Sequence, residues 1–83
     1  MALDNCLRVA PYGTGVVVDR FFRAHVAHSP LDREELRDIH ARYVAFCLEL
    51  GYTPLPTRSF GRYIAAPRQR SNGRTFIPGI RLL

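Results

Sequence analysis

Apolar residues recur at helical spacing in three stretches of this 83-residue chain, and the first stretch covers residues 16–27. Val18, Phe22 and Val26 follow one another at steps of four, which places them on one face of a helix. Pro30 ends the stretch, because proline disfavours the helical conformation in the residue before it. The sequence therefore predicts a first helix with one apolar face.

The second helical pattern is longer and clearer. Asp32 is followed three residues later by Glu35, which is the spacing of a capping box at a helix N-terminus. The apolar face that follows consists of Leu36, Ile39, Tyr43, Phe46, Cys47 and Leu50. Gly51 is typical of a helix C-terminus. We therefore predict a second helix between Asp32 and Gly51.

A third, short helix is predicted over residues 58–66. Thr57 is a suitable N-cap, and Phe60 and Ile64 lie four residues apart, so that both face inward. Pro67 ends the helix. A helix this short cannot bury itself, so we expect it to lean on the second helix.

The C-terminal residues predict a β-hairpin. Asn72 and Gly73 are a strong signal for a two-residue turn, in which both residues need positive φ. Pro78 and Gly79 predict a bulge or bend in the returning strand. That strand is expected to add three residues to the core, namely Phe76, Ile80 and Leu82.

Together these elements predict an α+β fold, a winged helix-turn-helix of three helices plus a C-terminal β-hairpin wing. The winged-helix domain is expected to occupy residues 15–83. Residues 1–14 show no sustained period and contain Pro11 and Gly13, so they are predicted to form an N-terminal arm or loop. In this layout the third helix and the hairpin lie side by side.

The net charge of +5 is distributed unevenly along the chain. Residues 1–51 carry six arginines and all seven acids, whereas residues 52–83 carry six arginines and no acid. A basic block of this kind is typical of a surface that binds a polyanion. The alternative is a basic face that is merely solvated.

Seven residues of this block are candidate nucleic-acid contacts: Arg58, Ser59, Arg62, Arg68, Arg70, Asn72 and Arg74. Arg58 and Arg62 lie four apart on one helix face and are predicted to contact phosphates. Arg70 and Arg74 flank the turn and are expected to emerge on the same face of the hairpin. A two-stranded ribbon fits the major groove, where arginine pairs with guanine. The alternatives are a solvated helix face and a strand edge protected by charge.

Motifs for catalysis, cofactors and metals are missing from the sequence. It contains no glycine-rich phosphate loop, no HExxH and no GxSxG. His25 and His28 form the only close pair of potential zinc ligands, and neither Cys6 nor Cys47 has a CxxC partner. We therefore expect a protein that is not an enzyme and binds no metal or cofactor. Unpaired cysteines favour a cytoplasmic location, and no apolar run reaches the ~20 residues that span a membrane.

Residues 43–61 (YVAFCLELGYTPLPTRSFG) resemble the middle of the regulatory factor X type of DNA-binding winged helix. The positions that carry the resemblance are Tyr43, Cys47, Pro54, Ser59, Phe60 and Gly61. The ending from Arg70 to Arg81 is similar to that family's wing and to its closing Gly-Leu/Ile-Arg. The same pattern also resembles the C-terminal winged-helix domain of phage and plasmid primase-helicases, with Phe-Gly-Arg followed by Gly-Ile-Arg-Leu.

The resemblance implies a winged helix that binds duplex DNA, in replication or transcription control of a phage or plasmid. In the regulatory factor X family the wing reads the major groove, and the third helix lies over the minor groove and backbone. The implied groove contacts are Arg70, Asn72 and Arg74, and the implied backbone contacts are Arg58, Ser59 and Arg62. Here the segment between helix and wing is shorter, so either element can be the one that enters a groove. The rival hypothesis is a protein-interaction winged helix that docks an acidic replication partner, such as a helicase or primase.

Overall fold

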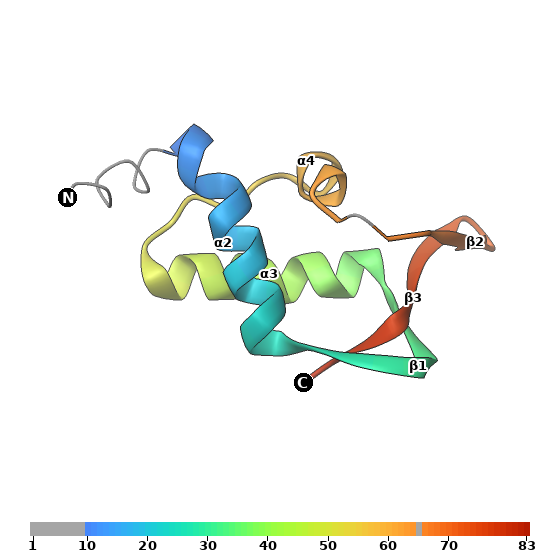
Figure 1. Ribbon diagram of the computed structural model, residues 1–83. Helices are drawn as coiled ribbons and strands as arrows, with labels where there is room; N and C mark the ends of the chain where they lie inside the picture. Colours follow the sequence, from blue (N-terminus) through green and yellow to red (C-terminus); the bar gives the residue numbers. More distant parts are fainter. Residues whose placement is uncertain (1–9, 65) are drawn as a thin grey trace.

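Helices and a three-stranded antiparallel sheet build the protein, which confirms the α+β class (Figure 1). The computed structural model describes residues 10–64 and 66–83. In chain order the elements are α2 (Ala10–His25), β1 (Val26–Glu35), α3 (Leu36–Leu50), α4 (Thr57–Arg62), β2 (Gln69–Ser71) and β3 (Arg74–Leu82). None of the helices in the described part of the chain is long and apolar enough to cross a membrane.

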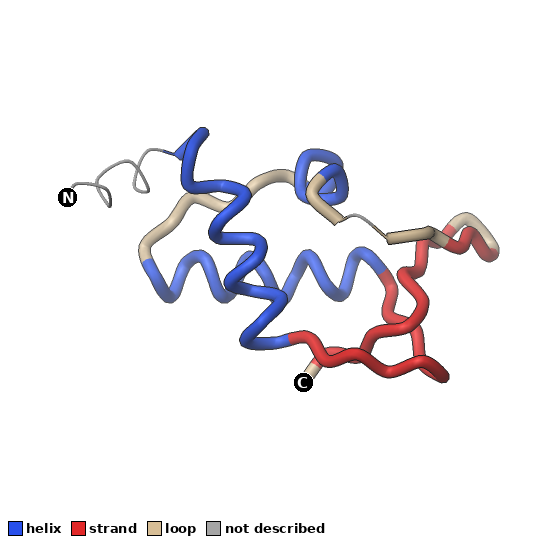
Figure 2. The backbone as a smooth tube through the Cα atoms, in the orientation of Figure 1, coloured by secondary structure: helices blue, strands red, loops and turns tan. Residues whose placement is uncertain are grey.

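The sheet has the order β1-β3-β2, so the C-terminal strand is the central one. Figure 2 shows the strands beyond the N-terminal end of α3, with β1 leading directly into that helix. Val26 pairs with Leu82 at one end of the β1–β3 ladder, and Glu35 pairs with Phe76 at the other. The register shifts between His28 and Arg33, opposite the predicted bulge at Pro78 and Gly79. Gly79 has a φ of 84°, a left-handed conformation that glycine adopts without strain.

Strand β1 replaces the start of the predicted second helix. That helix begins at Leu36, and its N-cap Glu35 is extended and makes no side-chain capping bond. Asp32 does not cap it either, because it lies within β1, three residues before the N-cap, and its carboxylate accepts a hydrogen bond of 2.5 Å from the hydroxyl of Ser29. The prediction of a capping box was therefore wrong. Residues 33–35 pair with β3 instead, which provides backbone partners that a capping box alone does not provide.

Helices α2 and α4 also differ from their predicted limits. Helix α2 begins at Ala10, within the segment expected to be an arm, and ends at His25. Pro11 lies in its first turn, where the missing N–H costs no helical hydrogen bond. Residues 1–9, which make up the rest of the predicted arm, lie outside the described residues. Helix α4 ends at Arg62 rather than near residue 66, and its N-cap is Pro56 instead of Thr57.

The core consists of Val17, Val18, Phe21, Ile39, Tyr43, Phe46, Cys47, Phe60, Ile64 and Ile77. Phe21 lies at its centre, and its ring is within 6.3 Å, centre to centre, of the rings of Tyr43, Phe46 and Phe60. Phe22, which the spacing placed on the apolar face of the first helix, is only partly buried against this cluster. The core thus joins α2, α3 and α4 to the central strand.

The returning strand contributes Ile77 to the core rather than Phe76. Successive residues of a strand point to opposite faces, so Phe76 lies on the outer face of the sheet when Ile77 points inward. Ile80 and Leu82 pack against the core, as predicted. The irregularity at Gly79 lets both Ile77 and Ile80 face inward although three positions separate them.

Candidate nucleic-acid interface

Two adjoining hollows lie between α4 and the β2–β3 hairpin, and they share Leu36, Thr57 and Thr75. The first has a volume of about 260 Å³ and is also lined by Arg58, Gly61, Arg62 and Arg68. The second has a volume of about 400 Å³ and continues along Glu35, Arg37, Gly73 and Arg74. We call the two hollows together the arginine groove, because five arginines line it.

Helix α4 forms one wall of the arginine groove because contacts with α3 hold it there. Its Phe60 is fully buried and stacks on Tyr43. His40 of α3 lies 2.6 Å from the carbonyl oxygen of Leu55 and 3.2 Å from the hydroxyl of Thr57. Since a carbonyl only accepts, the Nε2 of His40 donates to Leu55. These bonds attach the segment before α4, and the helix's first residue, to α3.

Arg68 closes the space between α4 and β2. Its guanidinium donates a hydrogen bond to the carbonyl oxygen of Gly61 in α4. A Cβ atom at position 61 would lie 3.3 Å from the same guanidinium nitrogen, which is tighter than ordinary packing. Glycine at position 61 therefore allows the close approach of the arginine. Arg68 therefore links the segment before β2 to α4, in addition to supplying a positive charge to the groove.

The predicted site residues fall into two groups. Arg58, Arg62, Arg68 and Arg74 line the arginine groove, as their predicted elements required. Ser59, Arg70 and Asn72 do not line it. Ser59 is half-buried, whereas Arg70 and Asn72 are exposed on the hairpin. In the part of the chain that the structure describes, neither Arg58 nor Arg62 forms an ion pair.

The hairpin has the predicted turn but not the predicted pairing of its arginines. Asn72 and Gly73 have φ values of 51° and 76°, so the two-residue turn is confirmed. Such a turn pairs Ser71 with Arg74, and Arg70 with Thr75. Arg70 and Arg74 therefore point to opposite faces of the hairpin, and the expectation that they share a face was wrong.

Glu35 is a residue of the groove that sequence reasoning missed. Its carboxylate oxygens lie 3.2 Å and 3.3 Å from the Nη2 and Nε atoms of Arg74, a two-point contact. Arg37 lies further away, with its Nε atom 3.9 Å from the same carboxylate. The Glu35 side chain is only 11% exposed. The capping-box spacing is a local pattern, and it carries no information on a contact with Arg74, which lies 39 residues further along the chain.

A second contact fastens the hairpin to β1 on the outer face of the sheet. The guanidinium of Arg33 lies over the ring of Phe76 at 3.9 Å from its centre. The same group donates a hydrogen bond of 3.1 Å to the side-chain oxygen of Gln69 in β2. Cation–π attraction and the hydrogen bond both oppose movement of the hairpin relative to the rest of the sheet.

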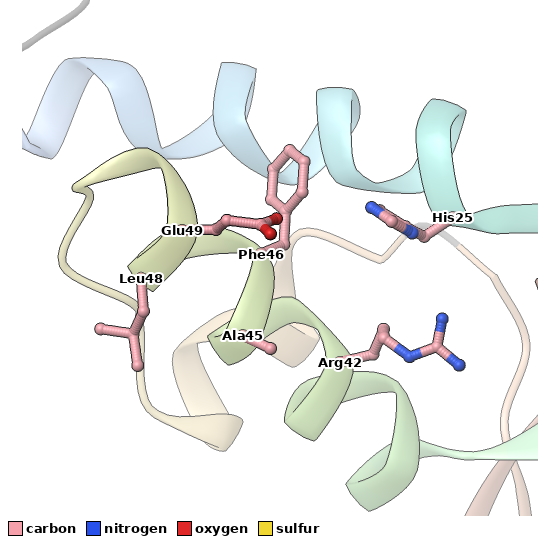
Figure 3. Close-up of a pocket in the computed structure, with 6 residues that line it drawn as sticks. All are labelled: His25, Arg42, Ala45, Phe46, Leu48 and Glu49. Carbon is pink, nitrogen blue, oxygen red and sulfur yellow. The ribbon is translucent and has the colours of Figure 1, made fainter.

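Two other hollows have a different character. One has a volume of about 430 Å³ and lies between α2 and α3, with His25 and Arg42 at one end and Leu48 at the other (Figure 3). The second has a volume of about 370 Å³ and is mostly apolar, with the residues Gly15, Val18, Asp19, Phe22, Tyr63, Ile64, Ala66 and Ile80. The first contains one arginine and the second none, so the arginine groove is the most cationic of these hollows.

Among the described residues, two groups have a shifted pKa, and both belong to the core. Burial raises the pKa of Tyr43 to about 12, although the N–H of Leu55, which donates to its hydroxyl at 3.1 Å, opposes the rise. Burial also raises the pKa of the Cys47 thiol. The residues that the structure describes contain no group of three or more histidine, cysteine, aspartate or glutamate side chains placed to hold a metal ion.

Comparison with known proteins gives no relative of this chain. No model of a protein family matches it, and neither a search of curated proteins nor a search of solved structures found a match. Function is therefore inferred from the chain's own geometry and charge.

Proposed function

We propose that this chain is a winged-helix domain that binds double-stranded DNA along the arginine groove. A short helix packed on a longer one, beside a hairpin that completes a small sheet, is the layout of that class of DNA-binding domain. The order helix, strand, helix, helix, strand, strand and the sheet order β1-β3-β2 support it. The resemblance of residues 43–61 to DNA-binding winged helices supports a role in replication or transcription control of a phage or plasmid.

The observation that carries the proposal is the composition of the arginine groove. Five arginines line it, and Glu35 is its one carboxylate. Cations at this density neutralise phosphates and release their counterions, which is the main source of affinity for DNA. Thr75 also lines the groove, where its hydroxyl is able to donate a hydrogen bond to a phosphate oxygen.

The proposed DNA contacts come from α4 and from the hairpin. Arg58 and Arg62 on α4 form no ion pair among the described residues, so their full charge is available for the phosphates of the DNA backbone. Arg70 extends the cationic surface along the exposed part of the hairpin, and Asn72 adds a neutral amide there. Ser59 is half-buried next to these arginines and is a candidate for a backbone contact at the edge of the interface.

The test is the salt dependence of binding to a short duplex of random sequence. We expect a Kd of ~10⁻⁴–10⁻⁶ M at physiological salt, with affinity that falls steeply and linearly on a double-logarithmic plot as salt rises. Chemical shifts of amides in α4 and the hairpin should change on titration, while those lining the hollow between α2 and α3 should not.

Absence of binding at low salt would contradict the proposal. Shift changes confined to the hollow between α2 and α3 would contradict it too. In either case an acidic protein partner, such as a helicase or primase, becomes the hypothesis to pursue. Direct binding of such a partner to the arginine groove in preference to DNA would establish that alternative.

A further inference from the structure

A carboxylate inside a groove that binds phosphates works against binding, and Glu35 occupies such a position. Its side chain lines the arginine groove beside Leu36 and Gly73. Glu35 ends β1 and is the N-cap of α3, so the strand pairing and the helix both fix its backbone. With a side chain only 11% exposed, it is a rigid acceptor rather than a mobile surface charge. Glu35 lowers the affinity of the groove for phosphate and is nevertheless held rigidly there, so we expect it to have a different function.

The contact between Glu35 and Arg74 uses one edge of the guanidinium. The carboxylate accepts from the Nε and Nη2 atoms of Arg74 at 3.3 Å and 3.2 Å. A guanidinium has five N–H donors in a planar fork, so three remain, on Nη1 and on the second position of Nη2. These remaining donors include a parallel pair at the tip of the side chain. The Arg74 side chain is 55% exposed, so this tip is accessible.

The charge of the pair determines which acceptor suits this tip. A carboxylate at 3.2 Å offsets much of the charge of Arg74, although Arg37 lies 3.9 Å from the same carboxylate, so this guanidinium attracts a second anion such as a phosphate less strongly than an unpaired arginine does. The Glu35 carboxylate still repels an anion at this tip, whereas a neutral base edge meets no such repulsion. Guanine presents O6 and N7 in the major groove at the spacing of a parallel donor pair. Arg58 and Arg62, which no carboxylate opposes in the described residues, remain suited to phosphates.

We propose that Arg74 reads guanine in the major groove and that Glu35 is the positioning residue that orients its guanidinium. This inference rests on the proposed function, because it assigns sequence specificity within the same groove. It also distinguishes the two arginines of the hairpin. Arg70 points to the other face and has no carboxylate partner among the described residues, so it supplies charge and not base readout.

The experiment begins with in vitro selection of duplexes that the full chain prefers over a random pool. Affinities for the selected duplex and for a random duplex are then measured for wild type, Glu35→Gln and Arg74→Lys. Gln places an NH₂ group against the guanidinium N–H, which breaks the two-point contact. Lys keeps the charge and loses the fork. Glu49→Gln is the control, since it makes the same charge change at an exposed site on the opposite end of α3.

We expect wild type to prefer the selected duplex by at least ~10-fold, and both test variants to lose most of that preference. Affinity for the random duplex should rise slightly in Glu35→Gln, because the variant removes a negative charge from the groove. Replacing the selected guanines by 7-deazaguanine, which lacks the N7 acceptor, should weaken wild type and leave Arg74→Lys unaffected. Glu49→Gln should behave as wild type does. Circular dichroism and thermal melting show whether each variant folds. If Glu35→Gln does not fold, Arg74→Lys alone tests the proposal.

Two results would overturn the inference while leaving DNA binding in place. One is a selection that returns no motif. The other is a Glu35→Gln or Arg74→Lys variant that keeps the full preference, with Glu35→Gln binding both duplexes more tightly by the same factor. In that case Glu35 only competes with DNA for Arg74. Failure of wild type to bind any duplex would instead contradict the proposed function itself.

Discussion

The ring of Phe60 stacks on that of Tyr43, with ring centres 4.4 Å apart and ring planes inclined by 25°. Phe60 is the one large side chain of α4 that is buried. A helix of six residues has no stability of its own in water. The orientation of Arg58 and Arg62 toward the arginine groove therefore depends on this contact between α4 and α3.

Phe60→Ala should lower the free energy of unfolding by ~3–5 kcal/mol, because the truncation leaves a cavity at the centre of the core. That loss is much of the total for a domain of this size. Urea denaturation followed by circular dichroism measures it. Leu31→Ala is the control, since Leu31 is 98% exposed and its truncation should change stability by less than ~0.5 kcal/mol. Equal stabilities of Phe60→Ala and wild type would disprove the packing of α4 on α3.

Arg58→Ala and Arg62→Ala should weaken binding to all duplexes by a similar factor. Each should also reduce the slope of log affinity against log salt by ~1, since each removes one phosphate contact. Fluorescence anisotropy at several salt concentrations gives both quantities.

Arg20→Ala and Arg81→Ala provide the matched control for this pair. Both arginines are exposed, and neither lines the arginine groove, so the net charge changes equally while the groove stays intact. The control variants should keep the wild-type slope to within about half a unit. A double variant of Arg58 and Arg62 that binds as tightly as wild type would place the DNA elsewhere.

Arg74→Ala and Arg70→Ala should differ in stability although both remove a hairpin arginine. Arg74→Ala leaves the mostly buried Glu35 carboxylate without its closest partner, so we expect a loss of up to ~1 kcal/mol at low salt. Added salt should shrink the loss, because it screens the ion pair in wild type. Arg70→Ala should be nearly neutral. Thermal melting of the two variants checks this, and identical melting would contradict a stabilising ion pair between Arg74 and Glu35.

Tyr43 should make the protein sensitive to alkali. Its pKa is about 12 in the folded state, against about 10 in an unfolded chain. A raised pKa means that the folded state holds the proton more tightly, so stability is intact below pH ~10 and falls as the pH rises toward 12. The expected decrease is at most ~1.4 kcal/mol per pH unit in that window.

The chain contains no lysine, so no ammonium side chain titrates in this range. Ultraviolet absorbance of tyrosinate should show one phenol that ionises later than the others, and urea denaturation at a series of pH values should show the loss of stability. Tyr43→Phe should abolish the late step. A late step that persists in Tyr43→Phe would assign it to another tyrosine.

Local signals predicted much of the fold. The apolar face of α3 and the turn at Asn72 and Gly73 depend on neighbours within one or two turns of chain, so spacing alone identifies them. Strand β1 gives no such signal. It contains Pro30 and a run of charged residues, without the alternation of a half-buried strand. It is a strand because β3 pairs with it, and that partner lies far along the sequence.

The candidate site also contains residues that local spacing predicts and residues that it does not. Arg58 and Arg62 were predicted from a spacing of four, and the structure has both of them lining one hollow. The faces of Arg70 and Arg74 depend on the register of the hairpin, where an error of one residue inverts the result. Glu35 contacts Arg74 across the β1–β3 pairing, so no local sequence pattern predicts their contact.

The pairing of Val26 with Leu82 has a kinetic consequence. The β2–β3 hairpin joins near neighbours and can form within microseconds, as can the turns of α3. The β1–β3 ladder instead closes a loop that contains most of the chain, which costs far more entropy before any contact rewards it. Folding should therefore be limited by closure of this ladder, and its rate should be slow for so small a domain. Pairing of Val26 with Leu82 is therefore part of the slow step that completes the native state.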